Sequence, residues 1–308
     1  QVRSLGDPTP DPSSASLDVT VVQGQATISA SADPSTIEVL TGTTTVSVTV
    51  ESDGPAPTGD VEYSVDGDVI ATSALAGDGT TEAELGPFPE SGVVTVDVDY
   101  LGDANTGGAG TSTQITVEPV ASTTALSLAP AKVVVGSGTT TATATVTSSA
   151  AVAGNVEFLV DGDVVATEPV SGGTATAELG PFATVGSVAV EARFAGSTTV
   201  AESSDTGTLQ VAKATPTMTL STKPAKVHVK KTKVKVAVAL ASAGVRVSGT
   251  VTVQADGRTY QANVNGKGKV TITLKPFRST GRERITVTYG GDALNTKVTK
   301  KTTITVVR

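Results

Sequence analysis

Apolar and polar residues alternate with a period of two along most of the chain, as they do in half-buried β-strands. The clearest runs cover residues 46–50, 61–65 and 94–98. Gly, Pro, Asp and Ser separate the runs and predict turns. Thr and Val are the commonest residues and Gly and Ser are frequent, whereas residues that favour helices, other than Ala, are scarce. The pattern therefore predicts an all-β protein.

One stretch of ten residues occurs three times, at 59–68, 154–163 and 249–258. Its first glycines are 95 residues apart in both intervals. A fixed period of this length indicates tandem copies of one domain. We predict a Pro-rich linker with an orphan strand, followed by three domains, at residues 1–25, 26–119, 120–213 and 214–308.

Each copy predicts the same order of strands and turns. A first strand leads to a proline kink, at Pro34, Pro130 or Pro224. The repeated stretch contains Asp-Gly, which tolerates the positive φ that a tight hairpin needs. About seven strands with frequent turn signals are typical of an Ig-like β-sandwich. We therefore expect three tandem Ig-like β-sandwich domains, joined by short Pro-containing linkers into an elongated rod.

Composition narrows the possible chemistry. The chain has no Cys, no Trp and a single His, His228, which excludes disulfides, thiolate metal sites and a Ser/His pair. No apolar run reaches the roughly 18 residues of a membrane-spanning helix. We therefore expect a protein that is not an enzyme and has no membrane span. The start at Gln1 lacks the apolar segment of a signal peptide, which predicts a processed or truncated product.

Charge is segregated along the sequence. Residues 33–119 contain 16 acidic and no basic residues, residues 120–213 contain 8 and 3, and residues 214–308 contain 3 and 18. The formal net charge of −8 therefore conceals an acidic first domain and a basic third domain. Blocks of like charge often mark an interaction surface.

Four lysines cluster on the predicted second strand of the third domain: Lys230, Lys231, Lys233 and Lys235. We predict that they bind an anionic partner, either a cell-envelope polymer or another protein, through long-range attraction. The alternative is a solvated face that discourages the pairing of edge strands. Nucleic acid is not expected as a partner, because no stacking aromatic residues accompany the lysines.

A short alternating segment precedes the first domain and places Leu17, Val19 and Val21 on one face. Its counterparts at residues 115–117 and 209–211 each close a repeat. The segment is therefore either the last strand of an upstream domain or a donor strand that completes a sheet edge of another copy.

Paired aspartates flank two of the hairpin turns, at Asp66 and Asp68 and at Asp161 and Asp163. Such pairs could ligate Ca²⁺, but turn formation by Asp-Gly explains the same spacing. The third copy has Arg258 in place of the second carboxylate, which argues against a metal site common to all repeats. We expect no cofactor, with Ca²⁺ as the alternative left open.

Three motifs recur in the copies: residues 154–158 with Asp161-Gly162, residues 179–182, and residues 100–104 or 289–293. They resemble the motifs of the bacterial Ig-like repeat family, group 3 type, found in secreted and surface proteins of actinobacteria. The second copy departs from the last motif at residues 194–197. The resemblance covers residues 26–308 and implies an extracellular stalk, spacer, adhesive arm or accessory module without catalytic residues.

Three hypotheses for function follow. The first is a non-catalytic extracellular stalk or adhesive region of a bacterial surface or secreted protein, whose basic third domain contacts the anionic envelope or a partner. The second is a structural subunit that polymerises head to tail into a filament, through its acidic and basic domains or by donor-strand exchange. The third is an accessory module of an upstream extracellular enzyme.

Overall fold

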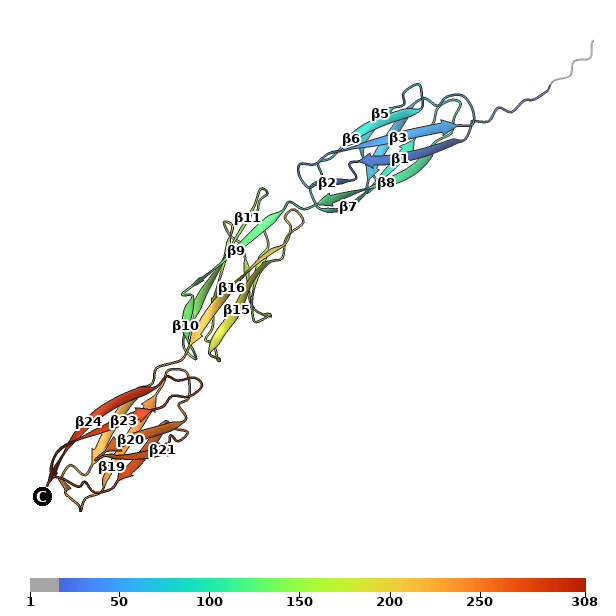
Figure 1. Cartoon of the computed structure of the whole chain (residues 1–308). Helices are drawn as coiled ribbons and strands as arrows, with labels where there is room; N and C mark the ends of the chain where they lie inside the picture. Colours follow the sequence, from blue (N-terminus) through green and yellow to red (C-terminus); the bar gives the residue numbers. More distant parts are fainter. Residues whose placement is uncertain (1–16) are drawn as a thin grey trace, which may run out of the picture. The chain divides into compact units, whose positions relative to one another are not determined.

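The computed structural model describes residues 17–308, which fold into 24 strands joined by turns and loops (Figure 1). The strands form six sheets, paired as three β-sandwiches. The all-β class and the three tandem sandwiches predicted from the sequence are confirmed. The first sandwich lies in one compact unit, and the second and third lie in another, residues 120–308. No helix in the described part of the chain is long and apolar enough to cross a membrane.

Strands at the same place in each sandwich are equivalent, so that β1, β9 and β17 correspond. The first sandwich contains β1 (Ala26–Asp33), β2 (Thr36–Glu38), β3 (Thr44–Ser52), β4 (Asp60–Val65), β5 (Asp68–Ala74), β6 (Thr80–Leu85), β7 (Gly92–Tyr100) and β8 (Ala109–Glu118). The second contains β9 (Ser122–Ala129), β10 (Lys132–Val134), β11 (Thr140–Ser148), β12 (Asn155–Val160), β13 (Asp163–Pro169), β14 (Thr174–Leu179), β15 (Gly186–Phe194) and β16 (Ser203–Ala212). The third contains β17 (Thr217–Lys223), β18 (Val227–His228), β19 (Val234–Ala241), β20 (Thr250–Ala255), β21 (Arg258–Asn263), β22 (Lys269–Leu274), β23 (Gly281–Tyr289) and β24 (Val298–Val307).

The sheet order is the same in all three sandwiches. In the first, a three-stranded sheet has the order β1-β3-β6 and a five-stranded sheet the order β2-β8-β7-β4-β5. β2 pairs with β8 in parallel, whereas the other neighbours are antiparallel. Each sandwich has eight strands rather than about seven. The reason is that the chain crosses to the other sheet after Pro34 or its equivalent and adds a short strand there.

The Asp-Gly hairpins form as predicted. Asp66 and Gly67 have φ of 52° and 86°, and the two equivalent pairs also have positive φ. A two-residue loop with positive φ at both positions matches the twist of the flanking strands. A β-bulge interrupts the same strand pair at residues 63–64 and 158–159, whereas the third sandwich pairs without one.

Each pair of sheets encloses one apolar layer. Tyr63 and Tyr100 fill it in the first sandwich, Phe158 and Phe194 in the second, and Tyr289 in the third, all between 0 and 2% exposed. Each such ring buries about 150–250 Å² of surface. Because successive side chains of a strand point to opposite faces, every second residue stays on the outer surface. Outer faces, loops and sheet edges are therefore the places where the repeats can differ.

A network of hydrogen bonds fixes a loop of the first sandwich. The Asp103 carboxylate accepts bonds from the backbone N–H and the hydroxyl of Thr58, both at 2.7 Å. It also accepts bonds from the N–H groups of Asn105 and Thr106, both at 2.7 Å. The Thr58 hydroxyl, followed by the backbone donors, holds the pKa of Asp103 well below its usual range.

The third sandwich repeats this arrangement and the second does not. Asp292 accepts bonds from the N–H and hydroxyl of Ser248 at 2.8 and 2.9 Å, and from the N–H of Asn295 at 2.7 Å. Burial acts to raise the pKa of Asp292, but these bonds outweigh it and hold the pKa well below its usual range. The second sandwich has Ser197 here, whose hydroxyl accepts a bond from the Val200 N–H at 3.1 Å.

We predict that acid destabilises the first and third sandwiches more than the second. A carboxylate whose pKa is lower in the folded than in the unfolded state stabilises the fold above its unfolded pKa, about 3.9 for Asp. This contribution is lost as the pH falls below about 4 toward the folded-state pKa. Hydrogen exchange of the full chain near neutral pH and near pH 3, corrected for intrinsic exchange rates, measures how much stability each sandwich loses in acid.

Asp103→Asn and Asp292→Asn should each weaken their own sandwich at neutral pH and make its stability less dependent on pH. The matched control is Asp60→Asn, at an exposed carboxylate outside the network. Equal sensitivity of all three sandwiches to acid would show that the network has no such role.

Candidate anion-binding surface

The four predicted lysines lie in the turn before β19 and in its first residues, and all are exposed. Lys230, Lys231 and Lys233 occupy the turn between β18 and β19, and only Lys235 is part of β19. Their assignment to the second strand is therefore wrong for three of them. The strand begins only at Val234, where alternate residues become buried.

The backbone of this turn is fixed by a hydrogen bond. The Lys230 N–H donates to the Phe277 carbonyl oxygen at 2.8 Å. Lys230 has a φ of 58°, in the left-handed region that favours glycine. The equivalent residues Leu40 and Gly136 have φ of 67° and 77°. The turn thus requires this conformation in every sandwich.

Strand pairing adds another lysine to the cluster. Lys223, at the end of β17, lies directly opposite Lys235 of β19. Lys223, Lys233 and Lys235 line a hollow of about 620 Å³ beside Pro224, which we call the lysine concavity. Lys223 was not predicted from the sequence, because strand register rather than distance along the chain brings it beside Lys235.

The charges of the lysine concavity repel one another. Like charges at directly opposed strand positions destabilise a sheet, by up to about 1 kcal/mol. Within residues 17–308, no ion pair with a carboxylate offsets the repulsion between Lys223 and Lys235. An anion placed between them would relieve this repulsion and accept hydrogen bonds from both ammonium groups.

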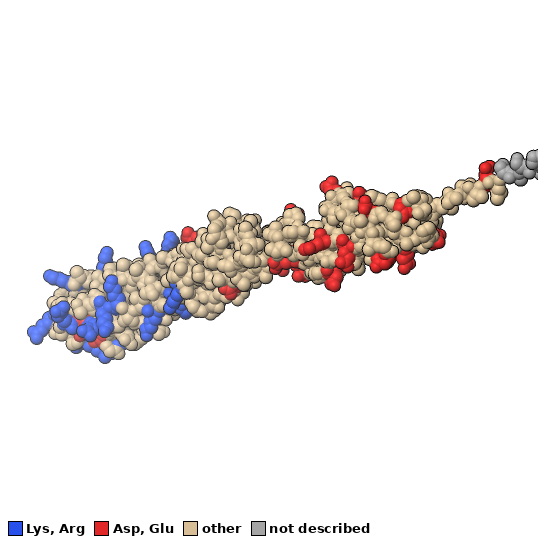
Figure 2. Space-filling model, turned by 90° about the horizontal axis from the view of Figure 1, so that it is seen from above, with Lys and Arg blue, Asp and Glu red and all other residues tan. Residues whose placement is uncertain are grey.

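The carboxylates of the third sandwich are engaged elsewhere. Asp256 lies 3.4 Å from the guanidinium of Arg258 and 3.8 Å from that of Arg278. Glu283 accepts a hydrogen bond from a serine hydroxyl at 3.2 Å, and Asp292 belongs to the loop network. Figure 2 shows Lys and Arg spread over the surface of this sandwich. Its positive charge therefore remains available to a partner.

A second group of cations lies on the other sheet. Arg282 and Arg284 of β23 and Lys301 of β24 alternate with buried residues such as Ile285, which places them on the outer face of the five-stranded sheet. These cations do not line the lysine concavity.

The first sandwich carries one carboxylate at a position of the lysine concavity and another on the neighbouring strand of the same sheet. Asp33 takes the place of Lys223 and lies opposite Thr45. Glu84 flanks Thr45 on its other side. Figure 2 shows acidic side chains over the first sandwich. The same sheet face is thus acidic in one repeat and basic in another.

The predicted donor strand is uncovered. Leu17, Val19 and Val21 are 86%, 73% and 89% exposed and, among the described residues, belong to no strand. The chain first pairs at Gly24, which forms a parallel bridge with Thr106. The apolar face of the segment therefore has no cover in this structure, and the donor-strand hypothesis stays a prediction.

The aspartates considered for Ca²⁺ lie at hairpin turns. Asp161 has a φ of 50°, and its Oδ1 accepts a hydrogen bond from the Ala189 N–H at 3.1 Å. Over residues 17–308, no group of three or more His, Asp or Glu side chains could hold a metal ion. Turn formation accounts for Asp161 and its equivalents, and a Ca²⁺ site stays an untested alternative.

The fold and this surface define a chain of tandem β-sandwich repeats with a basic third repeat. No family model matches the chain, and no curated protein matches it. Among solved structures, it is similar to one of a 1.5-MDa bacterial ice-binding adhesin, with 18% identity over 92% of this chain and 99% of that chain and a TM-score of 0.40. It is also similar to a tetra-tandem repeat in the extending region of a large adhesion protein, with 16% identity over 92% and 74% of the two chains and a TM-score of 0.48. These likenesses concern the fold alone, and the resemblance to the group 3 type stays a prediction.

We predict that Lys230→Gly stabilises the third sandwich modestly, by up to about 1 kcal/mol. Removing the Cβ relieves the left-handed strain, which is worth roughly 1–2 kcal/mol, and the greater freedom of the unfolded chain offsets part of this gain. Native-state hydrogen exchange of amides in β19 and β23 measures the change. Lys231→Gly, which removes the same charge at a residue without positive φ, is the control, and equal effects of the two variants would refute the strain argument.

Proposed function

We propose that the chain is a non-catalytic, extracellular stalk or adhesive region of a bacterial surface or secreted protein. Its third sandwich binds an anionic partner, most simply an anionic polymer of the cell envelope, at the lysine concavity. The observation that carries this proposal is the group of three lysines around one hollow, with no carboxylate paired to them among residues 17–308.

A linear polyanion suits this surface better than a single small anion. The hollow is open and large, at about 620 Å³, and Lys230 and Lys231 extend the positive charge along the adjoining turn. Each repeat unit of a polyanion can meet a different lysine. Long-range attraction of this kind needs no closely shaped pocket, and it weakens as salt is added.

The single histidine and the two carboxylates with the largest pKa shifts have structural partners, which supports a binding role rather than catalysis. The His228 Nδ1 lies 2.6 Å from the carbonyl oxygen of Arg308. Asp103 and Asp292, the two carboxylates with the most strongly lowered pKa among the described residues, are held by backbone and hydroxyl donors of their own loops.

A second candidate function rests on the matching acidic face. Asp33 of the first sandwich is equivalent to Lys223 of the lysine concavity, and Glu84 lies on the same sheet beside Thr45, the equivalent of Lys235. The third sandwich of one chain would then bind the first sandwich of the next. Such a contact joins unlike surfaces, so it builds a head-to-tail filament unless the assembly closes into a ring.

Binding of the full chain to long-chain inorganic polyphosphate and to purified bacterial cell wall tests the first proposal. The triple variant Lys223→Glu, Lys233→Glu, Lys235→Glu should bind at least about tenfold more weakly. Each exposed contact contributes up to about 1 kcal/mol, and charge reversal turns attraction into repulsion. Binding is measured at low and at physiological salt.

The matched control is Arg282→Glu, Arg284→Glu, Lys301→Glu, which changes the net charge equally on the other sheet. It should retain most of the binding. Undiminished binding by the lysine variant would refute the site, and equal loss in both triple variants would show attraction to the net charge alone.

Sedimentation of the full chain over a range of concentrations tests the second candidate. Head-to-tail assembly predicts species that grow with concentration at low salt and dissociate at high salt. The lysine variant should not form them. A chain that sediments as a monomer under all these conditions eliminates the filament.

A further inference from the structure

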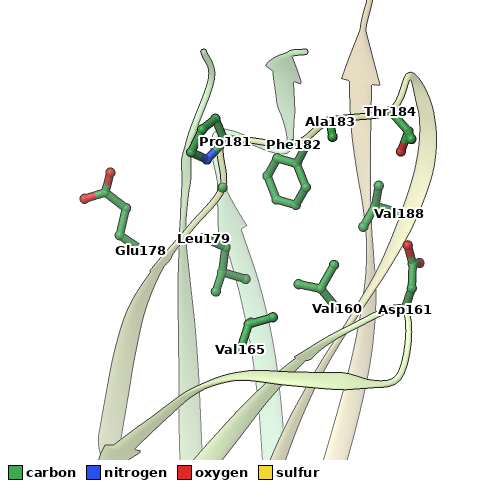
Figure 3. Close-up of a pocket in the computed structure, with 11 residues that line it drawn as sticks. Val160, Asp161, Val165, Glu178, Leu179, Pro181, Phe182, Ala183, Thr184 and Val188 are labelled. Atoms are coloured by element: carbon green, nitrogen blue, oxygen red, sulfur yellow. The ribbon is translucent and has the colours of Figure 1, made fainter. Parts of the chain in front are cut away.

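The second sandwich has an open cavity of about 390 Å³ at the edge between its two sheets (Figure 3). Apolar side chains from both sheets and from the loop after β14 line it, among them Val160, Val165, Leu179, Phe182 and Val188. The polar side chains of Asp161, Glu178 and Thr184 complete the lining. In Figure 3 the Phe182 ring lies across the hollow from Val160 and Val165, and Asp161 stands beside Val188. Phe182 is 8% exposed and Val165 is 52% exposed, so the cavity has a covered side and an open side.

The third sandwich fills the equivalent space with its own side chains. Arg258 donates a hydrogen bond from Nη1 to the Pro276 carbonyl oxygen at 3.1 Å, and the same nitrogen lies 3.4 Å from an Asp256 carboxylate oxygen. The Tyr260 hydroxyl accepts a bond from the Lys275 N–H at 3.2 Å, and the side chain packs against the core. An arginine and a tyrosine together close this edge.

The second sandwich lacks both of these side chains. Asp163 stands in the place of Arg258, and Ala166, which pairs with Phe158 as Tyr260 pairs with Val253, stands in the place of Tyr260. A carboxylate cannot reproduce the contacts of a guanidinium, and alanine is far smaller than tyrosine. The cavity is therefore the space that the two side chains of the third repeat occupy.

The second sandwich retains the two residues whose equivalents contact Arg258 in the third sandwich. Asp161 is equivalent to Asp256, and Pro181 is equivalent to Pro276. Asp161 uses Oδ1 to accept the bond from Ala189, whereas its Oδ2 makes no hydrogen bond among the described residues. The second sandwich therefore retains an acceptor site for a guanidinium but supplies none itself.

We propose that this cavity binds an arginine side chain presented by a partner protein. The methylene groups of the arginine lie against Phe182 and Val165. Its guanidinium pairs with Asp161 and donates to the Pro181 carbonyl, as Arg258 does with the equivalent groups of the third sandwich. This partner differs from the one proposed for the lysine concavity, because the two sites select opposite charges.

Arginine fits these features better than other side chains do. Its planar guanidinium offers several donors in a fixed geometry and reaches two acceptors at once, whereas the lysine ammonium is a compact point charge. A neutral apolar group would fill the cavity but leave Asp161 without a partner. Glu178 also lines the cavity and adds negative charge. This repeat contains 8 acidic and 3 basic residues, so its net charge also attracts a cation.

Titration of the isotope-labelled full chain with acetyl-Gly-Arg-Gly-amide, followed by NMR, tests the proposal. Saturable shifts are expected for amides of residues 160–165 and 180–184. The peptide with citrulline, which has nearly the same shape but no charge, should bind about tenfold more weakly or worse. Asp161→Asn should lower the affinity for the arginine peptide by a similar factor.

Two further variants complete the test. Asp163→Arg with Ala166→Tyr transfers the side chains of the third repeat to the equivalent positions of the second and should abolish binding. Asp66→Asn makes the same change of charge at the equivalent turn of the first sandwich and should have no effect. Equal binding of the citrulline peptide, unchanged binding by Asp161→Asn, or no saturable shift up to about 50 mM peptide would overturn the proposal.

Discussion

The apolar layer between the two sheets is the interaction on which each sandwich depends. The chain has no cysteine, so no disulfide can join the sheets. Buried rings such as Tyr63, Phe158 and Tyr289, none of them measurably exposed, are each worth about 3–5 kcal/mol when a side chain of this size is truncated. An exposed charge contributes about 1 kcal/mol or less. The layer can therefore hold the fold while the outer charges change from repeat to repeat.

One cross-strand pair on the five-stranded sheet shows this freedom directly. The pair is Glu62 and Asp99 in the first sandwich, Glu157 and Arg193 in the second, and Thr252 and Thr288 in the third. The first combination repels, the second forms an ion pair at 2.6 Å, and the third is uncharged. All three occur in the same register without a change in sheet order. The segregation of charge is thus not required by the fold.

The sequence predicted the architecture well because the fold depends on local and periodic features. Alternation located the strands, and Asp-Gly located the hairpins at Asp66 and its equivalents. The short strands such as β2 escaped prediction, because three residues carry too little alternation to be recognised. The candidate surface was predicted only in part. Lys233 and Lys235 were identified, but Lys223 joins them through the pairing of β17 with β19, and the sequence alone does not give that register.

The edge between the sheets follows a different rule from the faces. Alternation decides which residues enter the apolar layer, but it does not say whether that layer is closed at its side. Closure depends on single residues, such as Tyr260 in the third sandwich and Ala166 in the second, which occupy the same register position and differ greatly in size. A repeat can therefore lose its edge cover without losing its fold, provided the remaining layer is large enough. The buried core of the second sandwich, with Phe158 and Phe194 fully enclosed, satisfies that condition and leaves the edge free to receive a side chain from another molecule.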